Sequence, residues 1–134
     1  MIQNSNLLEN RKRTIVEFLN NEILELKWVS LFGSVINKNF DENRSDIDIA
    51  FISSRNITNV ERWEIQEKLA SQLNIDIDLV DLSKSNDVIS FEAISKGINI
   101  FKKSSKKLEQ FLDSIYINYI QLNEDRKEIL EMYK

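Results

Sequence analysis

Two segments of the sequence carry a pair of aspartates two residues apart, Asp46-Ile47-Asp48 and Asp76-Ile77-Asp78. Successive side chains of an extended strand point to opposite faces, so each carboxylate pair falls on one face. The opposite faces are purely aliphatic or aromatic and carry Ile47, Ile49 and Phe51 in the first segment and Ile75, Ile77 and Leu79 in the second. If the two strands are neighbours and share a core on this side, up to four carboxylates meet on one open surface.

Such a group of carboxylates suits a divalent cation. Close carboxylates repel one another and raise one another's pKa unless a cation lies between them. Mg²⁺ prefers carboxylate oxygens and keeps water or phosphate oxygens as its remaining ligands. The pattern therefore indicates a Mg²⁺ site that presents the metal to a nucleoside triphosphate. Alternation alone does not distinguish this site from a solvated sheet face, although aspartate is a poor strand former and the motif occurs twice.

Gly33 and Ser34 follow an apolar segment, residues 28–32, and precede the first aspartate pair. Glycine lets a ligand approach the backbone closely, and a serine hydroxyl with free N–H groups after a strand can bind phosphate oxygens. A Gly-Ser dipeptide by itself is a weak signal because many turns contain one. Gly-Ser at a strand end, followed by a polar segment and then Asp-x-Asp on the next strand, is far more specific and favours the metal site.

The composition excludes several other kinds of chemistry. The 134 residues include no His, no Cys and no Pro, which excludes His-dependent triads, thiol nucleophiles, Cys/His zinc sites and disulfides. The net charge of −4 and the pI near 5.0 argue against sequence-independent binding of nucleic acid. No apolar run approaches the ~20 residues of a membrane span or resembles a signal peptide, so we expect a cytoplasmic protein without membrane contact.

Hydrophobic periodicity predicts the elements that must position these residues. We expect helices over residues 7–26, 59–73 and 86–96, strands over 28–32, 46–52, 74–82 and 98–101, and a long helix from residue 105. Thr58 and Glu61 have the spacing of a capping box, and Gly97 is expected to end its helix in the left-handed conformation. The alternation predicts an α/β (α+β) fold, a small mixed sheet with helices on one face and a long C-terminal helix.

The segment Leu31-Phe32-Gly33-Ser34, followed by Ser45-Asp46-Ile47-Asp48-Ile49, resembles the signature of the DNA polymerase beta-like nucleotidyltransferase superfamily. It is most similar to the minimal nucleotidyltransferases (MNT type), in which Gly-Ser and Asp-x-Asp stand about ten residues apart. Residues 78–82 are similar to the segment that supplies the family's third carboxylate, and residues 92–101 resemble its closing helix, glycine and strand. This resemblance implies a minimal nucleotidyltransferase domain over residues 1–103, with residues 104–134 as its C-terminal helical extension.

The resemblance also implies a role for each site residue. Asp46 and Asp48 are expected to hold one or two Mg²⁺ ions that bridge the triphosphate of ATP, and Gly33 and Ser34 to hold the β- and γ-phosphates. Asp78 is expected to complete the metal site and to help deprotonate the attacking hydroxyl. Asp76 shares the predicted face of Asp78, so the choice between them depends on the family pattern.

The chain departs from the family pattern in the segment between Ser34 and Asp46. Residues 35–45 are one more than the usual ten, and Val35 stands where members often have an arginine. Lys38 or Arg44 could supply the missing positive charge, and a solvated loop cation is the alternative. These departures bear on rate and nucleotide preference more than on the fold.

An apolar stripe continues through the C-terminal segment and comprises Leu108, Phe111, Leu112, Ile115, Tyr116, Tyr119, Ile120, Leu122, Ile129, Leu130 and Tyr133. Its first half can pack on the sheet's aliphatic face or on the first helix, and its later turns predict a protein interface.

Stand-alone minimal nucleotidyltransferases resemble MntA-type antitoxins encoded beside a HEPN-domain toxin. The resemblance implies Mg²⁺-dependent transfer of AMP from ATP to a tyrosine hydroxyl of that toxin, without direct nucleic-acid binding. The alternatives are a stoichiometric binding antitoxin with weak or no catalysis, and a nucleotidyltransferase for a small molecule or RNA.

Overall fold

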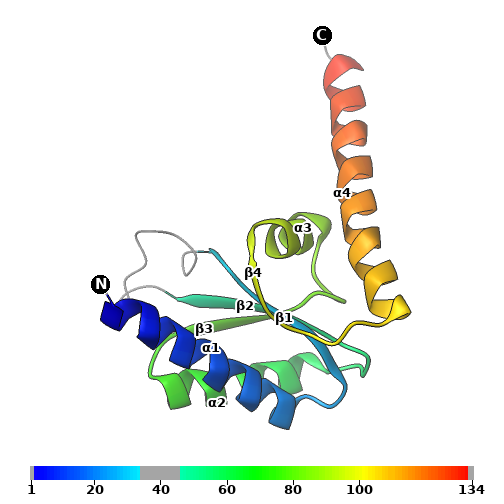
Figure 1. Ribbon diagram of the computed structural model, residues 1–134. Helices are drawn as coiled ribbons and strands as arrows, with labels where there is room; N and C mark the ends of the chain where they lie inside the picture. Colours follow the sequence, from blue (N-terminus) through cyan, green and yellow to red (C-terminus); the bar gives the residue numbers. More distant parts are fainter. Residues whose placement is uncertain (1, 34–45, 133–134) are drawn as a thin grey trace.

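The computed structural model describes residues 2–33 and 46–132, with side chains from Glu9 onward (Figure 1). The elements follow the predicted order and are α1 (Ile2–Glu22), β1 (Leu26–Phe32), β2 (Ile47–Ser53), α2 (Asn59–Leu73), β3 (Ile77–Asp81), α3 (Asp87–Lys96), β4 (Ile98–Lys102) and α4 (Lys106–Met132). The predicted mixed α/β fold with a long C-terminal helix is confirmed.

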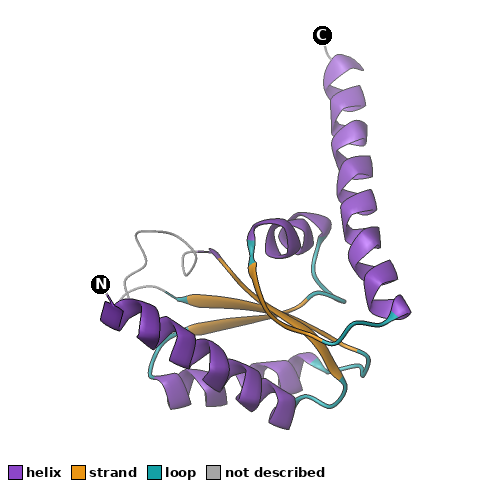
Figure 2. Cartoon of the chain, in the orientation of Figure 1, coloured by secondary structure: helices purple, strands orange, loops and turns teal. Residues whose placement is uncertain are grey.

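The described strands form one sheet in the order β3-β2-β1-β4 (Figure 2). Strands β2 and β3 run parallel, while β1 runs antiparallel to β2 and to β4. In this register Phe32 pairs with Asp48, and Asp48 pairs with Asp78. The end of β1 and the beginnings of β2 and β3 therefore meet at one end of the sheet.

Helices α1 and α2 cover the aliphatic face of the sheet (Figure 1). Their stripes of apolar residues pack on the faces predicted from the alternation, in a cluster that includes Ile15, Leu19, Ile23, Ile47, Ile49, Phe51, Leu69, Ile77 and Leu79. Each large side chain buried there contributes about 2 kcal/mol of hydrophobic stabilisation. This core holds β2 and β3 side by side with their aspartates facing away from it.

The opposite face is covered by α3 and the first turns of α4, so helices lie on both faces of the sheet, and the expectation of helices on one face was wrong in this respect. A second cluster there contains Trp28, Phe32, Ala50, Ile52, Leu82, Ala93, Leu108 and Ile115. The face that carries Asp48 is thus apolar farther along β2, at Ala50 and Ile52, and this part requires cover. Helix α4 accordingly packs on α3, rather than on the aliphatic face or the first helix as the sequence suggested.

The ends of α2 and α3 can be compared with the helix signals in the sequence. Thr58 caps α2 in a complete capping box with Glu61, and the Asn86 side chain accepts a hydrogen bond from the Ile89 N–H at the start of α3. Gly97 follows α3 as predicted, but its conformation is extended, with φ −74° and ψ 163°, so the left-handed assignment was wrong. A Cβ at Gly97 would lie 2.2 Å from the Ala93 carbonyl oxygen and 2.3 Å from Ser30 Oγ. Close packing, rather than backbone conformation, requires glycine there.

The later turns of α4 extend away from the body of the protein (Figure 1). Several of its apolar side chains are exposed there, namely Ile117, Ile120, Ile129, Leu130 and Met132. No described helix is long and apolar enough to cross a membrane.

Candidate active site

The sheet register brings the predicted catalytic aspartates together at one end of the sheet. Asp48 on β2 and Asp78 on β3 are direct partners in the parallel pair, and Asp46 immediately precedes β2. Both strands turn these aspartates toward the side of the sheet that α3 covers, because their neighbours Ile47, Ile77 and Leu79 are buried in the opposite core. The alternation that predicted a shared acidic face is therefore confirmed for Asp48 and Asp78.

Gly33 lies against the carboxylate of Asp48. Its φ is +73°, a left-handed conformation that other residues rarely adopt. A Cβ at this position would stand 2.1 Å from Asp48 Oδ2, so any side chain would displace the carboxylate. The end of β1 and the Asp-x-Asp strand are thus in direct contact, as the motif order suggested. Ser34, Lys38 and Arg44 lie outside the described residues.

The electrostatic environment of Asp48 reflects this concentration of negative charge. Burial, followed by the negative charges of Asp78, Asp46 and Glu92, together raise the pKa of its carboxyl from 3.8 to about 6. A carboxylate in this position is costly to ionise unless a cation compensates its charge. A cation bound at the acidic end of the sheet would therefore stabilise the ionised form of Asp48.

Asp76 is not part of this electrostatic group. It precedes β3, and its backbone carbonyl accepts a hydrogen bond from the Ile47 N–H at 2.9 Å. The charges that raise the pKa of Asp48 include Asp78 but not Asp76. The structure thus gives Asp48 a charge interaction with Asp78 and none with Asp76, which precedes the strand that begins at Ile77.

Asp81 serves the end of β3 instead of the acidic group. It is buried on the other side of the strand, and its Oδ1 accepts hydrogen bonds from Ser83 N at 3.0 Å and Ser83 Oγ at 2.7 Å. These bonds fix the turn after the strand.

Glu92 was missed by the sequence reasoning. It lies on α3, next to the buried Ala93, and its charge reaches Asp48. Only the packing of α3 over the acidic end of the sheet brings this glutamate close, and no periodic pattern within the helix indicates which element it faces. The available signal was an acidic residue on the helix that follows β3, the strand that carries Asp78.

Two cations border the site near Asp78. Arg62 and Lys84 share with Asp78 a cavity of about 250 Å³. Arg62 donates a hydrogen bond to the Leu79 carbonyl at 2.9 Å, and Lys84 donates one to the Ile57 carbonyl. Backbone carbonyls thus hold both cations in place at the β3 side of the site. The sequence predicted positive charge only in the segment before Asp46, at Lys38 or Arg44, so these two cations were not predicted.

The described carboxylates fit Mg²⁺ in ligand chemistry and in charge. Within residues 2–33 and 46–132 no group of three or more acidic side chains has the geometry of a complete metal cage. Mg²⁺ does not need such a cage, since it is usually held by one or two carboxylates together with phosphate oxygens and water. The adjacent Asp48 and Asp78 provide that number.

The arrangement is suited to a reaction at a phosphate. It combines the carboxylate oxygens of Asp48 and Asp78, which are hard ligands, with the Gly33 backbone beside them. One of these carboxylates can also accept a proton. The arrangement offers no thiol or imidazole, in agreement with the composition.

The family model "Polymerase beta, Nucleotidyltransferase" matches residues 13–106, which include every described site residue. The protein adenylyltransferase MntA of Shewanella oneidensis is 32% identical over 117 residues, which cover 87% of this chain and 83% of that protein.

Solved structures agree with these matches. A chain of a toxin–antitoxin structure with AMP-PNP has a TM-score of 0.79 and 32% identity, with 90% of this chain and 95% of that chain covered. A chain from a complex of a tri-AMPylated Shewanella oneidensis HEPN toxin with MNT antitoxin has a TM-score of 0.76 and 30% identity, with 92% and 95% covered.

Proposed function

Because the chain belongs to the polymerase beta nucleotidyltransferase family, we propose that it transfers AMP from ATP to a tyrosine hydroxyl of a partner HEPN-domain toxin. The transfer inactivates the toxin, so the protein serves as its antitoxin in the cytoplasm. The structural observation that carries this proposal is the contact of Gly33 with Asp48, beside Asp78. This contact places the residue after β1, which would approach the phosphates, beside β2 and β3, which carry the aspartates that would hold the metal.

The related proteins support the choice of substrate and acceptor. The relative that is 32% identical is a protein adenylyltransferase, and one similar structure holds the ATP analogue AMP-PNP. Another similar structure contains an AMPylated HEPN toxin. A carboxylate-based site without His fits AMP transfer, because a hydroxyl acceptor needs only a proton acceptor and compensation of phosphate charge.

Each site residue has a defined task in the proposed reaction. Asp46, Asp48 and Asp78 would hold Mg²⁺, which supplies charge compensation for the triphosphate when bound. Gly33 leaves the backbone open to the β- and γ-phosphates, and Ser34 would donate to them. Asp78 accepts the proton of the acceptor hydroxyl. The hydroxyl oxygen bonds to the α-phosphorus, and the bond between the α-phosphorus and the departing pyrophosphate breaks.

The proposal is tested by mixing the protein with the HEPN-domain toxin that the proposal assigns to it as partner. Radiolabel in the α-phosphate of ATP should transfer to that protein, and label in the γ-phosphate should not. Removal of Mg²⁺ with EDTA should abolish the transfer. Absence of α-label in the partner, in the presence of ATP and Mg²⁺, would contradict the proposed activity.

A binding-only antitoxin is the second candidate, motivated by the altered sequence after Ser34, where Val35 stands in place of the arginine that members of the family often have. Its distinguishing test is neutralisation of the toxin by the Asp46→Asn/Asp48→Asn double variant. Full neutralisation by that variant would favour binding alone. Loss of neutralisation with an intact complex would favour AMP transfer.

A further inference from the structure

The two edges of the described sheet differ in how their backbones are covered. Strands β3 and β4 are the outer strands of the sheet. At the β3 edge, side chains of α2 engage the backbone of Leu79: Gln66 Oε1 accepts from its N–H at 2.9 Å, and Arg62 donates to its carbonyl at 2.9 Å. Cover of this kind hinders an edge strand from pairing with another chain. The β3 edge is therefore partly covered, at Leu79.

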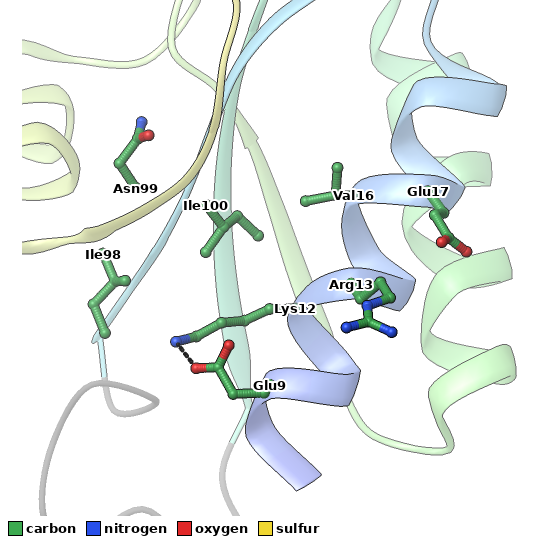
Figure 3. A pocket seen from close by; sticks show the side chains of 8 residues that line it. All are labelled: Glu9, Lys12, Arg13, Val16, Glu17, Ile98, Asn99 and Ile100. Atoms are coloured by element: carbon green, nitrogen blue, oxygen red, sulfur yellow. Dashed lines mark hydrogen bonds and ion pairs between the residues drawn. The ribbon is translucent and has the colours of Figure 1, made fainter. Parts of the chain in front are cut away.

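The β4 edge is not covered in this way. Within the described part of the chain, β4 hydrogen-bonds to β1 on one side, and no side chain of another element engages its backbone on the other. A cavity of about 520 Å³ lies beside it, between β4 and α1. Figure 3 shows Ile98 and Ile100 on the side of β4 that faces this cavity, with Val16 of α1 across from them. Ile98 is 38% exposed.

The charges around the cavity indicate what kind of molecule fits it. Its rim carries two cations, Lys12 and Arg13, and two anions, Glu9 and Glu17. Lys12 is already paired with Glu9 at 2.9 Å (Figure 3). A rim without net charge does not attract a phosphate or a nucleic acid. An apolar floor beside an open strand edge is the combination that binds an extended peptide, through main-chain hydrogen bonds and a side-chain pocket.

The position of the cavity relates it to the active site. Ile98 pairs with Leu31 in β1, and Gly33 follows two residues later, at the end of the sheet that carries Asp48. A strand added to β4 would lie about 14 Å from β2, the strand that carries Asp48, since neighbouring strands are ~4.8 Å apart and β4 and β1 lie between them. Four or five further extended residues, at roughly 3.3 Å each, span that distance. A peptide that runs along β4 past Ile98 can therefore deliver its next residues to the acidic end.

From these observations we infer that the open edge of β4, with the cavity between β4 and α1, binds an extended segment of the acceptor protein. The segment adds as a strand to β4 and places an apolar side chain over Val16, Ile98 and Ile100. It thereby brings the acceptor hydroxyl to the acidic end of the sheet. This inference rests on the proposed function for the identity of the acceptor, a HEPN-domain protein, but not for the existence of the docking surface.

The test is hydrogen exchange of this chain, alone and in complex with its HEPN-domain partner. The amides of Ile98–Lys102 that point away from β1 should exchange at least about tenfold more slowly in the complex than in the free chain. In a binding titration, Ile98→Lys should weaken the complex by about tenfold. The matched control is Leu24→Lys, an exposed apolar residue (61% exposed) beyond the other end of α1, which should bind as the parent chain does.

The possible outcomes separate the docking surface from the transferase activity. Slow exchange at β4 in the complex without AMP transfer would support the surface and contradict the proposed activity. AMP transfer with unchanged exchange at β4 would overturn the surface and leave the activity standing. Concentration-dependent protection of β4 in the chain alone would assign the edge to a second copy and overturn the inference. Because exchange is measured on the unmutated chain, the result does not depend on the folding of Ile98→Lys.

Discussion

Gly33 and Asp48 are in such close contact that a Cβ at position 33 would stand 2.1 Å from Asp48 Oδ2. The contact joins residues from two strands that the chain separates by the segment 34–47. It places the backbone that would approach the phosphates at the edge of the carboxylates that would hold the metal. The geometry of the site therefore depends on a position where no side chain is tolerated.

We expect Gly33→Ala to reduce AMP transfer by about 100-fold, because the methyl group displaces the Asp48 carboxylate. The positive φ adds a cost of about 1 kcal/mol in stability. Transfer rate and thermal unfolding measure the two effects separately. Gly97→Ala is the control: it should lower the Tm through its clash with Ala93 and Ser30 but retain transfer per folded molecule. Equal transfer by Gly33→Ala and the parent chain would contradict this account of the site.

Asp48→Asn should stabilise the metal-free protein above pH 6. The pKa of Asp48 is about 6 in the folded protein and near 3.9 in an unfolded chain. Between these values the folded state binds more protons than the unfolded state, so the Asp48 contribution to stability falls as pH rises from 4 to 6. Asparagine removes this loss, and in EDTA at pH 7.5 the variant's Tm should be higher by about 3 °C.

At pH 4, where Asp48 is protonated in the folded chain, the Tm difference between Asp48→Asn and the parent chain should nearly vanish. Thermal scans at several pH values in EDTA measure this trend. A difference that is constant with pH, or that favours the parent chain at pH 7.5, would show that Asp48 is not held in the environment described.

Asp78→Asn and Asp76→Asn form a matched pair that tests which carboxylate belongs to the site. We expect Asp78→Asn to lower the rate of AMP transfer by about 1,000-fold, since it removes both a ligand and a proton acceptor. Asp76→Asn should remain within about threefold of the parent chain, because Asp76 contributes its backbone carbonyl to Ile47. The reverse order of effects would assign the third carboxylate to Asp76.

Glu92→Gln should act on the site through charge. Removing a negative neighbour lowers the pKa of Asp48, so the acidic limb of the pH–rate profile should shift to lower pH. The maximal rate should stay within about threefold of the parent chain. A loss as large as that of Asp78→Asn, with no shift of the acidic limb, would make Glu92 a direct participant instead.

Ile115 and Ile117 test how α4 attaches to the body. Ile115 is buried in the cluster under α3, and Ile117 is 64% exposed. Ile115→Ala should cost about 3 kcal/mol in unfolding free energy, and Ile117→Ala less than about 0.5 kcal/mol. Chemical denaturation measures both values. Similar costs for the two variants would mean that α4 packs through a different face.

Most of the strand pattern was predictable because local rules determine it. Two-residue alternation identified the buried faces of β2 and β3, and the spacing of Thr58 and Glu61 located the start of α2. The proximity of Gly33 to the Asp-x-Asp strand followed from the order of the motifs. These features depend on neighbours in sequence or on adjacent strands.

The remaining features depend on tertiary packing that no local pattern encodes. The close approach of Ser30 and Ala93 explains why glycine is required at position 97. The packing of α4 on α3 follows from the apolar residues Ala50 and Ile52, which lie on the same face of β2 as Asp48. Glu92 enters the site because α3 crosses that face. The open edge at β4 is equally a product of strand order, since hydrophobic alternation does not specify which strand lies outside.

The most direct measurement of the central claim is the intact mass of the HEPN-domain partner after incubation with this protein, ATP and Mg²⁺. The account predicts one or more AMP adducts on tyrosine, and none when the protein carries Asp46→Asn and Asp48→Asn. An unmodified partner, or an adduct that forms equally with the double variant, would contradict the claim that these carboxylates transfer AMP.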